Sequence, residues 1–214
     1  MNDPAPNSAP PSKAAYHHGD LRRGLLDAAL ELVATRGVRG FTLREAARLA
    51  NVSHNAPYRH FPSRTHLLVA LAVEGQGHLL EALRASGSRT DDHRERIVRM
   101  GIAYMEFAMT RAAHFRVMFS SDVASERTPE LTAAQNATFE YFEGELRASE
   151  RAGVIRKNSV QKHALVGWSA LHGAAMLVLD GVLDNTAVAA RRKPREIARL
   201  VLEALLTGIG QPDA

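Results

Sequence analysis

Apolar residues recur at three- and four-residue steps along most of the chain, which is the spacing of amphipathic helices. In the first such stretch they are Leu21, Leu25, Ala28, Ala29, Leu32 and Val33. Asp20 before this stretch and Gly37 after it supply a cap and a stop. The same spacing predicts helices over residues 62–84, 91–111, 114–119, 129–152, 159–184 and 194–208. Because no stretch alternates as a strand would, we predict an all-α fold.

Two of these predicted helices carry further local signals. Thr128, Pro129 and Glu130 combine a cap, a first-turn proline and an acid near the positive end of a helix. Gly75 and Gly77 lie inside the helix over 62–84, where each costs up to about 1 kcal/mol relative to alanine. We therefore expect a bend or close packing at the two glycines.

Residues 41–61, FTLREAARLANVSHNAPYRHF, spell two short helices joined by a three-residue turn. Thr42 and Glu45 have capping-box spacing, so the first helix is predicted to begin at Thr42. Asn51, in the turn, is one of the few non-glycine residue types that tolerate positive φ. Two helices joined in this way are typical of a helix-turn-helix, whose partner is double-stranded DNA.

The second helix of this motif is predicted over residues 54–61. Ser53 is placed to cap it, and Pro62 would end it, because proline disfavours helical geometry in the preceding residue. Pro57 inside it removes one backbone donor, so we expect an irregular start. Three apolar side chains of the motif are assigned to the core: Leu49, Val52 and Phe61.

The basic charge is concentrated around this motif. Residues 13–64 contain nine Lys and Arg against four Asp and Glu, whereas residues 65–214 contain eighteen of each. Such a surplus would neutralise DNA phosphates. A solvated basic face is the alternative, and the adjacent motif favours DNA.

The stretch VSHNAPYRHFPSRTHLL, residues 52–68, with the helix before it, resembles the recognition helix and following helix of the TetR family of transcriptional regulators. The resemblance covers about residues 16–71, and Pro57 departs from the family pattern. It implies an N-terminal three-helix helix-turn-helix domain over residues 16–62. A C-terminal helical ligand-binding and dimerisation domain over residues 63–214 would follow, and residues 1–15 would form a disordered arm.

The resemblance also implies roles for single residues. Three match positions that read base edges: Arg44, His54 and Asn55. Asparagine can pair bidentately with adenine, and arginine with guanine. Four match positions that contact phosphates: Thr42, Tyr58, His60 and Arg64. Core packing of the Tyr58 ring and an ordinary surface position for His60 are the alternatives.

The segment GWSALHGAAM, residues 167–176, resembles a recurrent C-terminal type of the family through Trp168, His172 and Gly173. The candidate ligand-pocket residues are mostly aromatic or methionine: Met105, Phe107, Met109, Phe115, Met118, Phe119, Phe139, Phe142, Trp168, His172 and Met176. They predict a small apolar ligand that His172 would orient. Plain core packing is the alternative, and a satisfied buried histidine is the alternative for His172.

The last two predicted helices are more apolar than one domain of this size can cover. In the family, the corresponding helices pair into a four-helix dimer interface. The interface residues predicted here are Ala170, Ala174, Leu177, Val178, Ile197, Leu200, Val201, Ala204 and Leu205. A two-fold homodimer implies a palindromic operator.

Composition excludes several other classes of protein. The chain has no cysteine, so it has no disulfide or cysteine-based metal site, which suits a reducing cytoplasm. The most apolar window, residues 164–183, is interrupted by His172 and Asp180, so we expect a buried helix and no membrane partner.

No enzyme motif such as GxSxG, a P-loop or HExxH occurs, and the histidines at 54, 60, 66, 163 and 172 lack metal-ligand spacing. We predict no enzyme activity, metal or cofactor. Together with these exclusions, the resemblance to the TetR family implies a cytoplasmic homodimeric repressor that a small molecule releases from DNA. An architectural or chromosome-organising DNA-binding protein without an inducer is the alternative.

Overall fold

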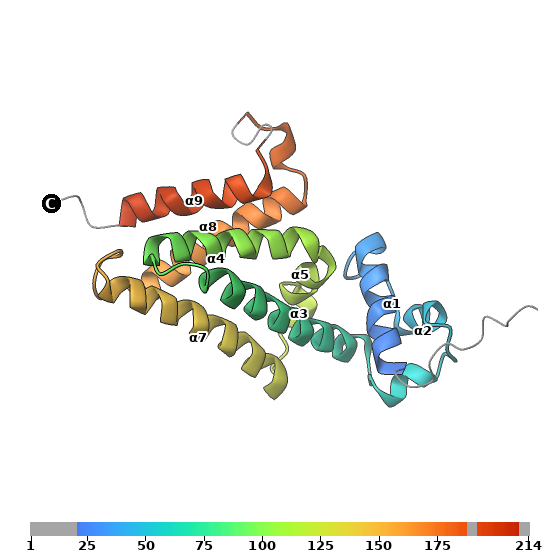
Figure 1. Cartoon of the computed structure of the whole chain (residues 1–214). Helices are drawn as coiled ribbons and strands as arrows, with labels where there is room; N and C mark the ends of the chain where they lie inside the picture. Colours follow the sequence, from blue (N-terminus) through green and yellow to red (C-terminus); the bar gives the residue numbers. More distant parts are fainter. Residues whose placement is uncertain (1–20, 188–191, 210–214) are drawn as a thin grey trace, which may run out of the picture.

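The computed structural model describes residues 21–187 and 192–209, and every regular element in these ranges is a helix. Figure 1 shows a small N-terminal group of helices at one end and a larger C-terminal group, with α3 running from one into the other. The all-α prediction is confirmed. The predicted arm at residues 1–15 and the proposed cap Asp20 lie outside the described residues.

The N-terminal group is built from α1, α2, a short 3₁₀ helix η1 and the start of α3. Their bounds are Leu21–Arg36, Leu43–Leu49, Ala56–Arg59 and Arg64–Gly87. Gly37 ends α1 with a φ of 77°, which confirms the predicted stop. Leu25, Ala46 and Phe61 meet in the core of this group, each less than 5 % exposed. These four elements therefore form one packed platform.

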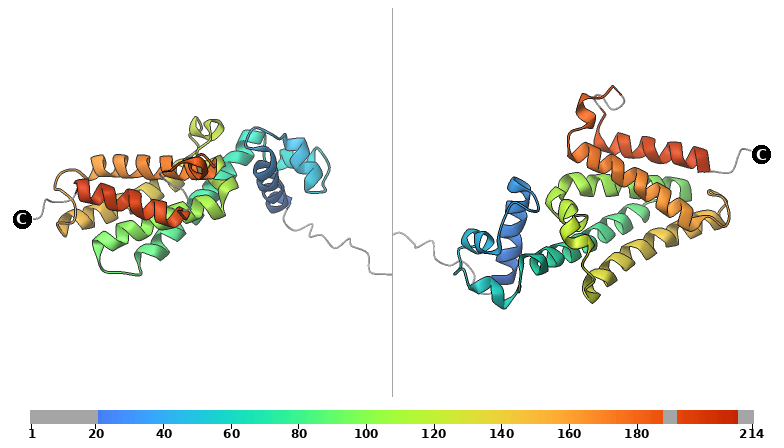
Figure 2. Two further views of the ribbon diagram at one scale, coloured as in Figure 1. Left: turned by 90° about the horizontal axis from the view of Figure 1, so that it is seen from above. Right: turned by 180° about the vertical axis from the view of Figure 1, so that it is seen from behind.

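The C-terminal group comprises α4, α5, α6, α7, α8, a 3₁₀ turn η2 and α9. Their bounds are His93–Thr110, Ala112–Met118, Ser121–Ala124, Pro129–Arg151, Val160–Leu179, Leu183–Asn185 and Pro194–Ile209. The helix α4 lies at the centre, packed on α3 and α9, while α7 packs on α3 and α8. The two views of Figure 2 show the same arrangement, with α9 on the outside of α8. In the C-terminal group, only the one-turn helix α6 and the 3₁₀ turn η2 were not among the helices predicted from the sequence.

The helix starts follow the local signals in the sequence. The Thr128 hydroxyl accepts a hydrogen bond from the backbone N–H of Leu131, which confirms the predicted start of α7. Ser63 caps α3 in the same way, and the Asp92 carboxylate caps α4. These caps satisfy backbone donors that would otherwise lack a partner at the helix ends.

The helix α8 is not the fully buried helix that its apolar composition predicts. Leu165 is 63 % exposed and Leu177 is 43 % exposed, whereas Ala175, on the opposite face, is fully buried. One face of α8 therefore packs on the core and the other is an apolar surface. No helix in the described ranges is long and apolar enough to cross a membrane.

An ionic contact joins the two groups of helices. The Asp122 carboxylate of α6 pairs with Arg64 of α3 and accepts a hydrogen bond of 3.3 Å from Arg39, which follows α1. Partial burial pushes the pKa of Asp122 upward, but the two guanidinium groups outweigh this effect, and its pKa lies below the usual value. Arg64 also donates a hydrogen bond of 2.6 Å to the backbone oxygen of Val38.

Candidate nucleic-acid interface and ligand cavity

The start of α2 is fixed by a complete capping box, as the sequence predicts. The hydroxyl of Thr42 accepts from the Glu45 N–H at 3.3 Å, and the Glu45 carboxylate accepts from the Thr42 N–H at 2.8 Å. The backbone hydrogen bond from Thr42, with further bonds from its hydroxyl and from Arg36, lowers the pKa of Glu45. This box holds Arg44, an exposed side chain, at a defined place on the first turn of α2.

The turn after α2 is formed as predicted, but the second helix is not. Asn51 has a φ of 56°, which confirms the positive value expected of the turn. The predicted helix over residues 54–61 is wrong: a 3₁₀ helix spans only Ala56–Arg59, and the Ser53 side chain does not cap it. Pro57 explains the difference, since it has no N–H to donate to the Ser53 oxygen, and Ala56 donates to that oxygen at 3.0 Å instead.

The side chains predicted to contact DNA lie at the surface of this platform, with one exception. Exposed residues among them are Thr42, Arg44, His54, Asn55, Tyr58 and His60. Tyr58 is 47 % exposed, so core packing of its ring does not occur. Arg64 is the exception, because it is held by Asp122, by the Val38 oxygen and over the Phe41 ring. A phosphate contact by Arg64 would require these interactions to be broken.

The core assignments of the motif are partly wrong. Phe61 is 3 % exposed and Val52 packs against the core, as predicted. Leu49, however, is 43 % exposed. It is the last residue of α2, so its side chain lies beyond the edge of the core that Ala46 and Ala47 cover.

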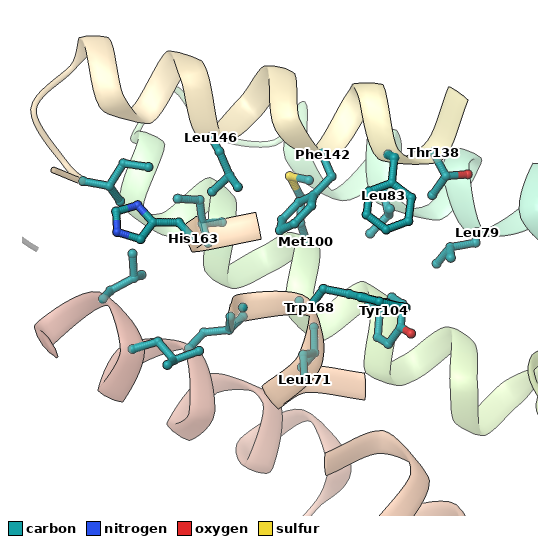
Figure 3. A pocket seen from close by; sticks show the side chains of 18 of the residues that line it. Leu79, Leu83, Met100, Tyr104, Thr138, Phe142, Leu146, His163, Trp168 and Leu171 are labelled. Atoms are coloured by element: carbon teal, nitrogen blue, oxygen red, sulfur yellow. The ribbon is translucent and has the colours of Figure 1, made fainter. Parts of the chain in front are cut away.

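A cavity of about 100 Å³ lies inside the C-terminal group. Figure 3 shows Thr138 and Phe142 of α7 on one side of it and Trp168 and Leu171 of α8 on the other. Further walls come from α3, α4 and α9, and the lining is almost entirely apolar. The cavity is thus suited to a small apolar molecule.

Four of the predicted pocket residues line this cavity: Phe119, Phe139, Phe142 and Trp168. Others pack in or against the core: Met105, Phe107, Met109, Phe115 and Met118. His172 and Met176 line a second hollow, which they share with Phe119 and with Val33 of α1. The sequence could not separate the residues that line this cavity from those that do not, because both kinds recur at the same helical spacing.

His172 fits the alternative interpretation, in which it is a buried histidine that is already hydrogen-bonded within the protein. Its Nδ1 lies 2.8 Å from the Tyr104 hydroxyl, and its ring stacks on Phe115 with centroids 5.4 Å apart. Burial lowers the pKa of His172 and raises that of Tyr104, so both groups are held neutral. The polar role predicted for His172 in the cavity is therefore not supported by its position.

Two other polar side chains line the cavity, and sequence reasoning missed both. His163, on the first turn of α8, is 5 % exposed, and its Nδ1 lies 3.3 Å from the Ser159 hydroxyl. Gln76 of α3 is 6 % exposed, and its amide makes no hydrogen bond within the described part of the chain. Among the described residues, the fully buried side-chain polar atom that lacks a partner is Nδ1 of His93, so the amide atoms of Gln76 remain accessible from the cavity. This makes Gln76 the candidate polar contact for a ligand.

The predicted interface residues of α8 and α9 divide into two sets. Leu177, Leu200 and Ala204 are exposed. Ala174 and Ile197 are at most 9 % exposed and face the chain's own core. The other four are half-buried: Val178, Val201 and Leu205 pack against the core, whereas Ala170 does not. Leu165 and Val166 were missed and extend the exposed apolar face of α8.

Comparison with known proteins agrees with this architecture. Residues 25–71 match the family described as bacterial regulatory proteins, tetR family, and residues 97–205 match the tetracyclin repressor-like, C-terminal domain. The chain is 27 % identical over 169 residues to an uncharacterised HTH-type transcriptional regulator of Mycobacterium tuberculosis, covering 77 % of this chain and 86 % of the relative.

Two further relatives extend the comparison. The transcriptional activator FasR of Mycolicibacterium smegmatis is 32 % identical over 108 residues, which cover 50 % of this chain and 49 % of FasR. A solved structure from Rhodococcus sp. RHA1, of unknown function, is 30 % identical with a TM-score of 0.78, covering 93 % of this chain and all of that one. The chain therefore belongs to the TetR family of DNA-binding transcriptional regulators.

Proposed function

We propose that the protein is a homodimeric repressor that recognises a palindromic operator and is released from it by a small apolar ligand. The observation that carries the proposal is the exposed group formed by Arg44, His54 and Asn55 on a platform of packed helices. Hydrogen bonds from these side chains to base edges would read the operator sequence. The exposed Tyr58 and His60, on the same segment, would bind phosphates and set the register.

The dimer is supported by the apolar surface that α8 and α9 leave uncovered. Leu165, Leu177 and Leu200 are all at least 43 % exposed, which is unusual for leucines within two packed helices of a monomer. A second copy of the chain, related by a two-fold axis, would cover them. Two recognition segments would then face half-sites about 34–36 Å apart, or a multiple of that spacing.

Ligand response is supported by the route from the cavity to the DNA-binding unit. Phe119 lines the cavity and stands two residues before α6. Asp122 of α6 holds Arg39 and Arg64 of the DNA-binding unit. A ligand that moves Phe119 would therefore shift the ion pairs of Asp122 with Arg39 and Arg64. This requires the ligand to bind the released arrangement of the protein more tightly than the DNA-bound one. The presence of a cavity favours this proposal over the architectural alternative, which needs none.

The DNA-binding part of the proposal is tested with operator duplexes obtained by genome-wide mapping of bound sites. Arg44→Ala and Asn55→Ala should each weaken operator binding by about 1–3 kcal/mol, while binding to a scrambled duplex changes little. Glu140→Gln, on the exposed surface of α7, is the matched control and should leave both affinities unchanged. Equal losses on the two duplexes would contradict a base-reading role.

The ligand part is tested through Trp168, which is the only tryptophan of the chain. Because its ring lines the cavity, its fluorescence should change when toluene, a small apolar probe, is added, and glycerol should have no effect. Leu146→Phe, in the opposite wall, should fill part of the cavity and weaken the response to toluene while leaving Trp168 as the only tryptophan. Repression itself is measured by transcription from the mapped promoter with and without the protein. Increased transcription in the presence of the protein would make it an activator.

A further inference from the structure

We propose that Glu74, His78 and His114 form a binding site for a divalent metal ion of the zinc class. One ligand atom from each residue lies within 4.8 Å of the other two. The Oε1 atom of Glu74 is 2.9 Å from Nε2 of His114 and 3.8 Å from Nε2 of His78. Two imidazole nitrogens therefore converge on one carboxylate oxygen.

The two distances to Glu74 are close to those around a tetrahedral ion, while the ligand nitrogens of His78 and His114, which lie within 4.8 Å of each other, have to reach the same separation. Zinc binds histidine nitrogen at about 2.0–2.1 Å and carboxylate oxygen at about 2.0–2.2 Å, which places tetrahedral ligand atoms about 3.3 Å apart. The Glu74 to His114 distance would lengthen by a few tenths of an ångström, and the Glu74 to His78 distance would shorten by a similar amount. Both changes are within the range of side-chain rotation.

The ligands are held by rigid elements. Glu74 and His78 are four residues apart on α3, so they lie on the same face of the helix one turn apart, and His114 comes from α5. Sequence spacing alone could not reveal this set, because His114 joins it only through the packing of α5 on α3. His114 is 5 % exposed, whereas Glu74 and His78 are partly exposed, so an ion can enter from the surface.

An outer contact orients one of the ligands. The second oxygen of Glu74, Oε2, pairs with Arg23 of α1, which leaves Oε1 directed at the two histidines. The Glu81 carboxylate lies 3.8 Å from Nδ1 of His78, which is too far for a hydrogen bond in this structure. If it approached further, it would stand behind a histidine ligand as carboxylates commonly do in zinc sites.

The donor set selects the kind of ion. Two imidazoles and one carboxylate suit zinc and its first-row neighbours, while magnesium and calcium prefer sites made of oxygen atoms. With three protein ligands, the fourth position would be taken by water. Binding would replace the Glu74 to His114 hydrogen bond by two metal bonds and so fasten α3 to α5 more firmly.

The test uses the full chain without an affinity tag and titrates zinc chloride by isothermal calorimetry. We expect one high-affinity zinc ion per chain and at least about a 100-fold loss of affinity in His78→Gln, since losses of 10–100-fold are typical even for outer-shell partners. His66→Gln is the matched control, because His66 is an exposed histidine of the same helix, twelve residues before His78, and should bind zinc as the wild type does. The pair His17 and His18 is present in every variant and contributes equally.

Thermal unfolding supplies a second measurement that does not depend on the calorimetric signal. Zinc should raise the Tm of the wild type and of His66→Gln, should raise that of His78→Gln and Glu74→Gln much less, and EDTA should reverse the rise. Magnesium chloride should have no effect. The assignment is overturned if the wild type binds no zinc, or if His78→Gln and Glu74→Gln bind it as tightly as His66→Gln does.

Discussion

Arg64, at the start of α3, and Asp122, in the one-turn helix α6, form an ion pair across the boundary between the helix-turn-helix unit and the C-terminal domain. The resemblance to the family assigns Arg64 to a phosphate, but in this arrangement its guanidinium is directed into the protein. Asp122 also holds Arg39, so one carboxylate connects α6 to two segments of the DNA-binding unit. The position of α6 and that of the DNA-binding unit are therefore linked.

Replacing this carboxylate should loosen the link. Asp122→Asn removes the charge that pairs with Arg39 and Arg64, and we expect the free energy of unfolding to fall by about 1 kcal/mol, or the Tm by about 2–4 °C. Because the pKa of Asp122 is lowered in the folded state, the stabilisation is present above about pH 4 and is lost as the pH falls through the folded pKa. Thermal unfolding at pH 7 and at pH 3 measures both effects.

Glu140→Gln, on the exposed surface of α7, provides the control for this change. It removes a carboxylate that has no ion pair among the described residues, so the Tm should stay within about 1 °C of the wild type. An equal decrease in both variants would show that the Asp122 pair contributes nothing to stability.

Two helical glycines should respond in opposite ways to alanine. A Cβ atom at Gly77 of α3 would meet open space, so Gly77→Ala should stabilise the protein by about 0.5–1 kcal/mol. A Cβ atom at Gly101 of α4 would lie against the side chain of Leu202, 3.2 Å from its Cγ atom and much closer to Cδ1. Gly101→Ala should therefore destabilise the protein by about 1–3 kcal/mol.

Denaturant titration of the two alanine variants gives the comparison directly. The same substitution in the middle of two helices isolates packing from helix propensity, because the propensity gain is common to both. If Gly101→Ala is as stable as Gly77→Ala, then α9 does not pack on α4 as closely as the structure shows.

The amide of Gln76 should matter for ligand binding more than for stability. Gln76→Leu replaces an amide that has no hydrogen bond in the described structure, and whose atoms are not fully buried, by an apolar group of similar size, so the free energy of unfolding of the unliganded protein should change by less than about 1 kcal/mol. Binding of a ligand with a polar group, such as phenol, should become weaker relative to toluene. The ratio of the two affinities, measured by Trp168 fluorescence, tests whether the amide contacts the ligand. An unchanged ratio would exclude that contact.

His172 should make the fold sensitive to mild acid. Burial lowers its pKa, whereas in the unfolded chain a histidine titrates near about 6.5. As the pH falls below that value, the unfolded chain binds a proton that the folded chain resists, so the free energy of unfolding decreases. His172→Gln should reduce this decrease between pH 7 and pH 5. The buried His114 and His163, whose pKa values are also lowered, will leave part of the slope. An identical slope in the variant would contradict the prediction.

Local signals in the sequence predicted much of the fold, because each acts within a few residues. The Thr42 and Glu45 box, the positive φ of Asn51 and the Thr128 cap all formed as expected. The shortening of the helix at Pro57 was only partly foreseen, since one missing donor changed the hydrogen-bonding pattern of the whole segment.

The errors arise where contacts between distant segments decide the outcome. The spacing that groups His172 with Trp168 is correct, but only the position of Tyr104 on α4 shows that His172 is already hydrogen-bonded. In the same way, Gln76 is an ordinary helical residue in the sequence, and it becomes a cavity residue through the packing of α3 against α7 and α4.

In the proposed complex, each copy of the protein reads base edges with three side chains, Arg44 on α2 and His54 and Asn55 just before the single 3₁₀ turn Ala56–Arg59. So few side chains can recognise only a few base pairs, so a sequence that matches one half-site occurs often in a chromosome. For the proposed dimer, specificity would come from requiring two half-sites at a fixed separation. Inserting or deleting a few base pairs between the half-sites should then reduce occupancy more than changing any single base pair.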